Sequence, residues 1–191
     1  MTSRSRVRAI TAAALSASVT IVLAACSGGS PAPTATATPI GKPVSQTCAE
    51  LLPLESLAVY GKAFEQVSSF TPAKGTPAAT IAQQQGRVCR FREVDDHAVT
   101  ITLAVADLPE KSLTNLKDAL YERGGSVPTY RVEGYFALAD DGVGRADAFA
   151  DPYWITASST LFTEPGGAQP VIDAVRSVVA PGASPSATPG S

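Results

Sequence analysis

His97 is the only histidine of this 191-residue chain and the first place to look for acid–base chemistry. Asp95 and Asp96 precede it directly, so a base with an orienting carboxylate can be drawn from these three residues. Adjacent residues in a polar turn do not converge on one substrate, however, and such a turn faces solvent. The pattern therefore favours a surface turn over a catalytic pair. With a single histidine, a zinc site is not expected either.

Carboxylates are the second group that could do chemistry. Five of them fall close together in the second half of the chain: Glu133, Asp140, Asp141, Asp147 and Asp151. Their oxygen atoms suit calcium, but the spacing of an EF-hand is absent, and an Asp-Asp-Gly sequence is what a hairpin turn needs. A hydrolase with carboxylate acid–base chemistry is the enzymatic alternative. It requires the Asp-Asp pairs at 95–96 and 140–141 to converge in one cleft.

Motifs of the common enzyme classes are missing from the sequence. It contains no Gly-x-Ser-x-Gly, no Ser-x-x-Lys, no phosphate-binding loop and no dinucleotide fingerprint. We therefore predict no catalytic residue, no metal site and no cofactor.

The N-terminus has the three parts of an export signal. Three arginines within the first eight residues are followed by an apolar stretch, Ala9 to Val22, that is short for a membrane span. It leads into Leu23-Ala24-Ala25-Cys26, which resembles the lipobox of bacterial lipoproteins. This resemblance implies that residues 1–25 are a signal peptide and that Cys26 carries a lipid. The alternative is an ordinary secretory signal that leaves Cys26 free.

A lipid on Cys26 places the protein on the extracytoplasmic face of the cell membrane. Each methylene buried in the bilayer is worth about 0.8 kcal/mol, so two or more acyl chains anchor a small protein stably. The membrane is thus the first expected partner, through the lipid on Cys26.

Composition divides the rest of the chain. Residues 26–43 are almost entirely Ser, Gly, Pro, Ala and Thr, and they predict a disordered tether because they bury too little apolar surface to offset chain entropy. Residues 181–191 have the same composition and predict a disordered tail. Residues 44–180 have the length of one domain with a single core.

Charge excludes one class of partner. The chain has 15 basic and 17 acidic residues, and without the three signal arginines 12 basic residues remain against 17 acidic ones. An acidic protein binds nucleic acid poorly, and it has no general attraction to anionic lipid. We therefore expect no nucleic-acid partner.

Two cysteines, Cys48 and Cys89, remain beside Cys26. In an exported domain two thiols are expected to pair. The loop between them is long, and the chain-entropy model gives about 4 kcal/mol of stabilisation for that length. The alternative is two free, buried cysteines.

Local patterns predict the order of the elements. A capping box at Thr47–Glu50 starts a helix near Cys48, and a second helical piece follows at 53–61. Residues 62–85 are predicted to be mostly loop, because prolines and a glycine interrupt them. Apolar alternation predicts an antiparallel hairpin from strands at 88–92 and 99–106.

The second half continues the pattern. Its predicted elements are a helix at 107–123, strands at 129–138, 144–150 and 153–162, and a helix at 169–180. The resulting order is α-β-β-α-β-β-β-α. It predicts an α+β domain in which an antiparallel sheet of about five strands has its helices packed on one face.

A family resemblance rests on the two cysteine segments behind the tether. These are Thr47-Cys48-Ala49-Glu50-Leu51-Leu52-Pro53 and Val88-Cys89-Arg90-Phe91. With them the chain resembles a broad group of small actinobacterial lipoproteins of uncharacterised function, over about residues 47–180. Phe91 stands where that group more often has tryptophan. The resemblance implies a disulfide and an extracytoplasmic location, and it implies no reaction.

Four aromatic residues are the remaining feature that could form a site: Tyr130, Tyr135, Tyr153 and Trp154. They are either core residues or, if they share an exposed sheet face, the lining of a groove for a glycan, lipid or peptide. We expect a non-catalytic envelope module that binds a partner protein or an apolar ligand through this face. The alternatives are the carboxylate hydrolase and an accessory protein without a ligand of its own.

Overall fold

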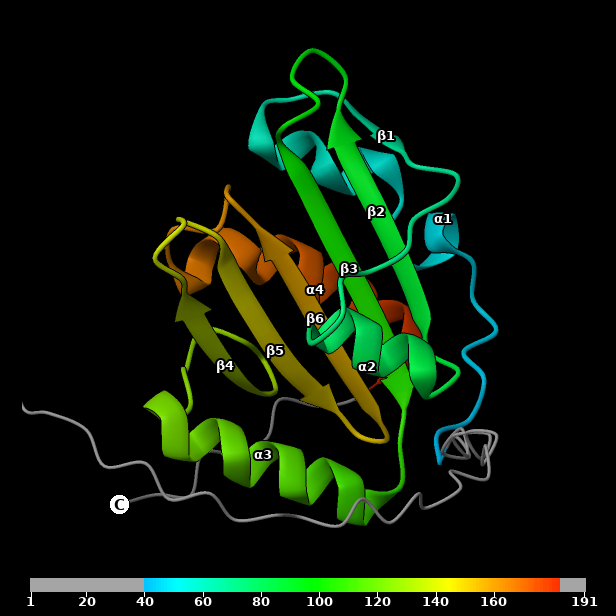
Figure 1. Ribbon diagram of the computed structural model, residues 1–191, viewed down its shortest axis with the longest axis vertical. Helices are drawn as coiled ribbons and strands as arrows, with labels where there is room; N and C mark the ends of the chain where they lie inside the picture. Colours follow the sequence, from blue (N-terminus) through cyan, green and yellow to red (C-terminus); the bar gives the residue numbers. More distant parts are fainter. Residues whose placement is uncertain (1–39, 183–191) are drawn as a thin grey trace, which may run out of the picture. The chain divides into compact units, whose positions relative to one another are not determined.

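A computed structural model describes residues 40–182 of the chain (Figure 1). The predicted signal peptide, Cys26, most of the predicted tether and most of the predicted tail lie outside the described residues. The end of the predicted tether belongs to the domain. The Ile40 amide donates to Gln84 Oε1 at 2.8 Å, and the Lys42 amide donates to the Asp107 carbonyl at 2.9 Å. The domain therefore begins before Val44.

The core of the fold is one six-stranded antiparallel sheet in the order β1-β2-β3-β6-β5-β4. The strands are β1 (Phe64–Gln66), β2 (Arg87–Glu93), β3 (Thr100–Asp107), β4 (Glu133–Leu138), β5 (Gly144–Ala150) and β6 (Tyr153–Ser159). Each half of the chain contributes three consecutive strands, and the two halves meet where β3 pairs with β6. The α+β class with an antiparallel sheet is confirmed, with six strands instead of about five.

Helical elements connect and cover the strands. They are α1 (Cys48–Leu51), the 3₁₀ helix η1 (Leu54–Tyr60), α2 (Pro77–Gln83), α3 (Glu110–Gly124) and α4 (Pro165–Val179). The capping box that starts α1 is confirmed, because Thr47 Oγ1 accepts the Glu50 amide and the Glu50 carboxylate accepts the Thr47 amide.

The prediction of mostly loop over residues 62–85 missed two short elements. This stretch contains both β1 and α2. Thr76 caps α2 by accepting the Ala79 amide at 3.2 Å, and Pro77 occupies the first turn, where a missing amide hydrogen costs nothing. The proline that suggested an interruption therefore starts a helix.

The prediction that all helices pack on one face was also wrong. In Figure 1, α4 lies behind the sheet and α2 lies in front of β2 and β3. We call the face covered by α1, η1 and α4 the inner face, and the face covered by α2 and α3 the outer face. The outer face is apolar in part because Ala104 and Ala106 of β3, both fully buried, leave room for a helix.

The predicted disulfide is confirmed. Cys48 and Cys89 are bonded, with their Cα atoms 5.6 Å apart and a sequence separation of 41. Cys89 lies on the inner face of β2, so the bond fastens α1 over that face.

Candidate functional site

The four aromatic residues do not form one exposed face. Tyr130 and Trp154 are 5% and 4% exposed and belong to different apolar clusters, Tyr130 on the inner face and Trp154 on the outer face. Tyr135 is buried on the outer face, and Tyr153 packs against the inner cluster. Consecutive strand residues point to opposite faces, so Tyr153 and Trp154 cannot share one. These rings are core residues.

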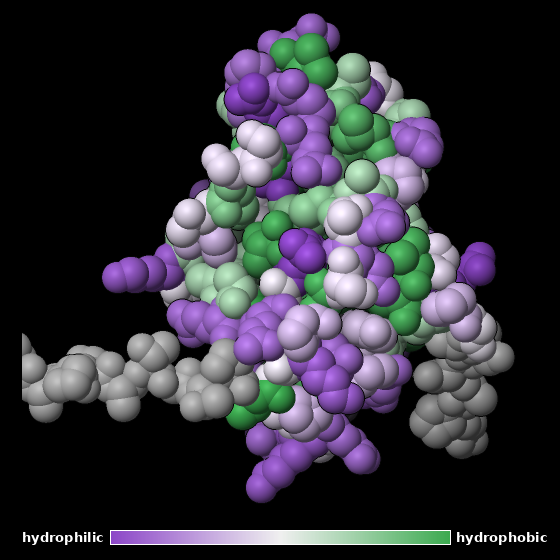
Figure 2. Space-filling view, turned by 90° about the vertical axis from the view of Figure 1, so that its right-hand side faces the viewer, coloured by the Kyte–Doolittle hydropathy of each residue, from purple (hydrophilic) through white to green (hydrophobic). Residues whose placement is uncertain are grey.

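Exposed hydrophobic residues do not supply an alternative docking face. Among the described residues, the large exposed ones are Ile40, Leu54, Val59, Val94, Tyr121 and Leu138. They lie on different elements of the domain. On the side drawn in Figure 2, hydrophobic groups alternate with hydrophilic ones. Isolated apolar residues of this kind are ordinary for a protein surface.

The carboxylates proposed for a hydrolase lie on two exposed loops. Asp95 and Asp96 are on the β2–β3 loop with His97, while Asp140 and Asp141 are on the β4–β5 turn. Two of these carboxylates have turn roles, since Asp96 accepts the Ala98 amide and Asp141 accepts the Val143 amide. The interpretation of His97 as part of a surface turn is confirmed. The condition for the hydrolase, convergence in a cleft, is not met.

Three of the carboxylates considered as calcium ligands are engaged in ion pairs. Asp147 is buried and paired with Arg145, and Glu133 and Asp151 share Lys117. Among residues 40–182, no three His, Cys, Asp or Glu side chains are grouped closely enough to hold a metal ion.

The outer face carries a polar row that the sequence alone did not reveal. Strand pairing sets Arg90 of β2 opposite Thr102 of β3, Thr102 opposite Ser158 of β6, and Ser158 opposite Arg145 of β5. The row thus has a guanidinium at each end and two hydroxyls between. Strands are about 4.8 Å apart, so the two arginine Cα atoms are on the order of 14 Å apart, and their long side chains can lean over the hydroxyls from both ends.

This row forms the floor of a cavity of about 340 Å³. We call it the arginine–hydroxyl pocket and define it by Arg90, Thr102, Thr156, Ser158 and Arg145. The wall is the segment from Phe70 to Ala78, which connects β1 to α2 and contributes mostly apolar and hydroxyl-bearing side chains. None of the described lining residues is acidic.

Arg145 is held in place by a buried carboxylate. Its Nε donates to Asp147 Oδ2 at 2.9 Å, and the indole Nε1 of Trp154 donates to Asp147 Oδ1 at 3.0 Å. Burial raises the pKa of Asp147, and the Arg145 charge together with hydrogen bonds from Trp154, Arg145 and Thr156 opposes that rise. The carboxylate uses one nitrogen of Arg145, so the two Nη groups are left to other partners.

Arg90 is held differently, by stacking. Its guanidinium carbon lies 4.3 Å from the centre of the Phe70 ring, and one Nη donates to Thr100 Oγ1 at 3.2 Å. Its Nε is buried and has no hydrogen-bond partner in the described part of the chain.

The chemistry of this pocket is anion binding. Guanidinium groups stay charged at any physiological pH and bind carboxylate or phosphate through paired hydrogen bonds, and hydroxyls add further donors. The described lining has no histidine, cysteine, lysine or carboxylate that would act as a base or a nucleophile. The groups present are therefore those that bind an anion.

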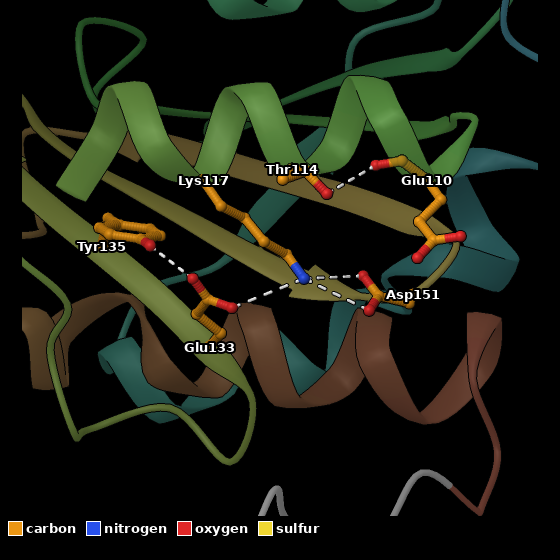
Figure 3. A network of polar contacts seen from close by, with 6 residues as sticks. All are labelled: Glu110, Thr114, Lys117, Glu133, Tyr135 and Asp151. Atoms are coloured by element: carbon orange, nitrogen blue, oxygen red, sulfur yellow. Dashed lines mark hydrogen bonds and ion pairs between the residues drawn. The ribbon is translucent and has the colours of Figure 1, made fainter.

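A second polar network lies under α3 (Figure 3). Lys117 Nζ lies 3.5 Å from Glu133 and 3.1 Å from Asp151, and the Tyr135 hydroxyl donates to Glu133. Lys117 also lies 5.4 Å from the centre of the Phe149 ring. Lys117 is shared by the two carboxylates, so the network fastens α3 to β4 and to the β5–β6 turn.

Comparison with known proteins gives no assignment: no family model, curated protein or solved structure matches the chain. Within residues 40–182, none of the helices combines the length and the apolar character needed to cross a membrane. The candidate site therefore stands on its geometry alone. The only trace of it in the sequence is that two arginines, Arg90 and Arg145, occupy polar positions inside predicted strands.

Proposed function

We propose that the protein is a lipid-anchored binding module of the cell envelope that holds an anionic ligand in the arginine–hydroxyl pocket. The cross-strand row from Arg90 to Arg145 is the observation that carries this proposal, because two fixed positive charges and two hydroxyls line one cavity. The lipobox at 23–26 and the disulfide support an extracytoplasmic place of action. The lining of the pocket supports a binding role, because it consists of guanidinium groups, hydroxyls and apolar side chains.

Native mass spectrometry tests the binding role. The full chain, exported from an actinobacterial host and purified from its membranes, is expected to retain extra mass that is lost on denaturation. Arg90→Gln and Arg145→Gln should each reduce the retained mass. Arg131→Gln removes the same charge from an exposed position outside the pocket and should leave it intact.

Binding should also depend on salt. Addition of inorganic phosphate or acetate to the bare protein should give saturable binding that weakens as ionic strength rises, because the attraction is between charges. A chain that carries no extra mass and binds neither anion would contradict the proposed function.

The anchor is tested separately. The Cys26→Ala variant should lose its lipid and be released from the membrane fraction into the medium or the periplasmic fraction. An unchanged membrane association would show that another segment holds the protein.

A further inference from the structure

The arginine–hydroxyl pocket adjoins a second cavity between α2 and α3. This cavity has a volume of about 200 Å³, and Pro77 and Arg145 line both cavities. A ligand group bound at Arg145 therefore lies at the border of the space between the two helices.

The second cavity has a different chemistry. Its walls include Leu116, Ala119 and Leu120 of α3, all half-buried, and the buried ring of Trp154 forms part of its floor. Polar groups are few: Thr80 and Arg123 are exposed, and both carboxylate oxygens of Asp147 are already engaged by Arg145 and Trp154. The half-buried leucines lose contact with water only when something apolar enters.

The two cavities together define a ligand class. We propose that the ligand is a single-chain amphiphile whose anionic head group lies between Arg90 and Arg145 and whose first methylene groups lie between α2 and α3. This inference rests on the proposed function, because the head group uses the same pocket. A small polar anion would leave the leucines in contact with water, and a neutral chain would form no ion pair with the arginine row.

The chain carries a built-in reporter for this ligand. Trp154 is its only tryptophan, and it lies at the second cavity. With the full-length, lipid-anchored protein in phosphatidylcholine vesicles, tryptophan fluorescence can follow titration with straight-chain carboxylates from acetate to octanoate. The matching alcohols provide the neutral series.

We expect carboxylate affinity to rise with chain length, by up to about fourfold for each methylene that becomes fully buried. The alcohols should bind far more weakly at every length. Arg145→Gln should weaken carboxylate binding by about tenfold or more, because a charge-assisted hydrogen bond is lost. The same titration with this variant corrects for partition of the longer probes into the vesicles.

Ala119→Leu tests the path of the chain. The larger side chain fills the space between the helices, so the ratio of octanoate to acetate affinity should fall toward one. Ala82→Leu, the same change at an exposed position of α2 outside both cavities, should keep the ratio of the unaltered protein. Far-UV circular dichroism verifies that each variant is folded.

The outcomes separate the two proposals. Carboxylates that bind through Arg145 with the same affinity at all lengths would overturn the amphiphile and leave the anion-binding function standing. Alcohols that bind as tightly as the acids would also overturn it. If no carboxylate gives an Arg145-dependent signal, the amphiphile is overturned, and the binding of inorganic phosphate then decides whether the anion-binding function stands.

Discussion

The two faces of the sheet are built from the same strands but differ in what covers them. The inner face is closed by α1, η1 and α4 over a large apolar cluster in which Phe91, Leu103 and Ile155 are fully buried. The outer face is covered in part, by α2 and α3, and an arginine row and two cavities occupy the rest. The residues of one strand that point to the inner face can therefore contribute to stability, while those that point to the outer face contribute to binding.

Burial decides which role each face takes. On β3 the inner residues Ile101, Leu103 and Val105 are uniformly apolar, whereas the outer residues change from Thr100 and Thr102 to Ala104 and Ala106. The change from threonine to alanine along β3 marks the border between the open pocket and the part of the outer face that the helices cover. Most of the folding free energy should therefore come from the inner face, and most of the selectivity from the outer face.

The largest expected effect comes from adjacent residues on opposite faces of β3. Leu103→Ala should lower the free energy of unfolding by about 2–5 kcal/mol, because it opens a cavity in a closed core. Thr102→Ala, one residue earlier on the outer face, should change it by less than about 0.5 kcal/mol. Urea denaturation of both variants measures the difference, and equal losses would refute the division of labour between the faces.

Removal of the disulfide should have the next largest effect, again on the inner face. The Cys48→Ser/Cys89→Ser double variant should lose about 2–4 kcal/mol, since the loop of 41 residues is no longer closed in the unfolded chain. Thermal and urea unfolding measure the loss. The arginine–hydroxyl pocket lies on the other face, so anion binding by the folded fraction should persist, and its loss would show that the faces are coupled.

Asp147 gives the outer face a pH dependence. Because burial raises its folded-state pKa above the unfolded value of about 3.9, its contribution to stability is fully present below about pH 4 and is lost as the pH rises through the folded-state pKa. Asp147→Asn removes this titration. The stability of the unaltered protein relative to the variant should therefore fall as the pH rises from 4 to 8.

Urea unfolding at several pH values measures this trend. Asp95→Asn on the exposed β2–β3 loop controls for the removal of one carboxylate. A stability difference between the unaltered protein and Asp147→Asn that is constant with pH would contradict the raised pKa.

The smallest effect is expected under α3. Lys117→Met removes ion pairs to Glu133 and Asp151, whose side chains are 41% and 65% exposed, so each pair should contribute no more than about 1 kcal/mol. Lys111→Met, exposed on the same helix, serves as the control in thermal unfolding. A loss as large as that of Leu103→Ala would place α3 among the main sources of stability.

Local features of this fold could be predicted from the sequence, and contacts between distant segments could not. The hairpin of β2 and β3, the strand 144–150, the cap at Thr47 and the Cys48–Cys89 bond follow from alternation, turn residues and cysteine count. The pairing of β3 with β6 joins residues that are 46 to 56 positions apart, from Asp107 with Tyr153 to Thr102 with Ser158, and leaves no local pattern. The pocket depends on that pairing, so the sequence alone could not place Arg90 and Arg145 at one cavity.

The missed helix explains the other difference. Prolines and a glycine predict mostly loop over residues 62–85, and this prediction leaves out α2. Without α2 the sequence gives no reason for the small residues Ala104 and Ala106, and the aromatic residues are the only candidates for a binding face. The burial of Tyr135 and Trp154 follows from the second layer of helices on the outer face, which a one-sided arrangement lacks, whereas Tyr130 and Tyr153 pack on the inner face.

The cross-strand row also helps to fix the register of the strands in the sheet. Side chains alternate with a period of two, so a slip of β5 by one residue would turn Arg145 into the inner cluster and bring Ala146 out. Asp147 shares that face of β5 and would turn inward with Arg145, so two charged groups would be buried among aliphatic residues at a severe cost in free energy. The charges proposed to select a ligand thus also reject the neighbouring registers, and a variant that makes the row apolar would lose this protection along with its ligand.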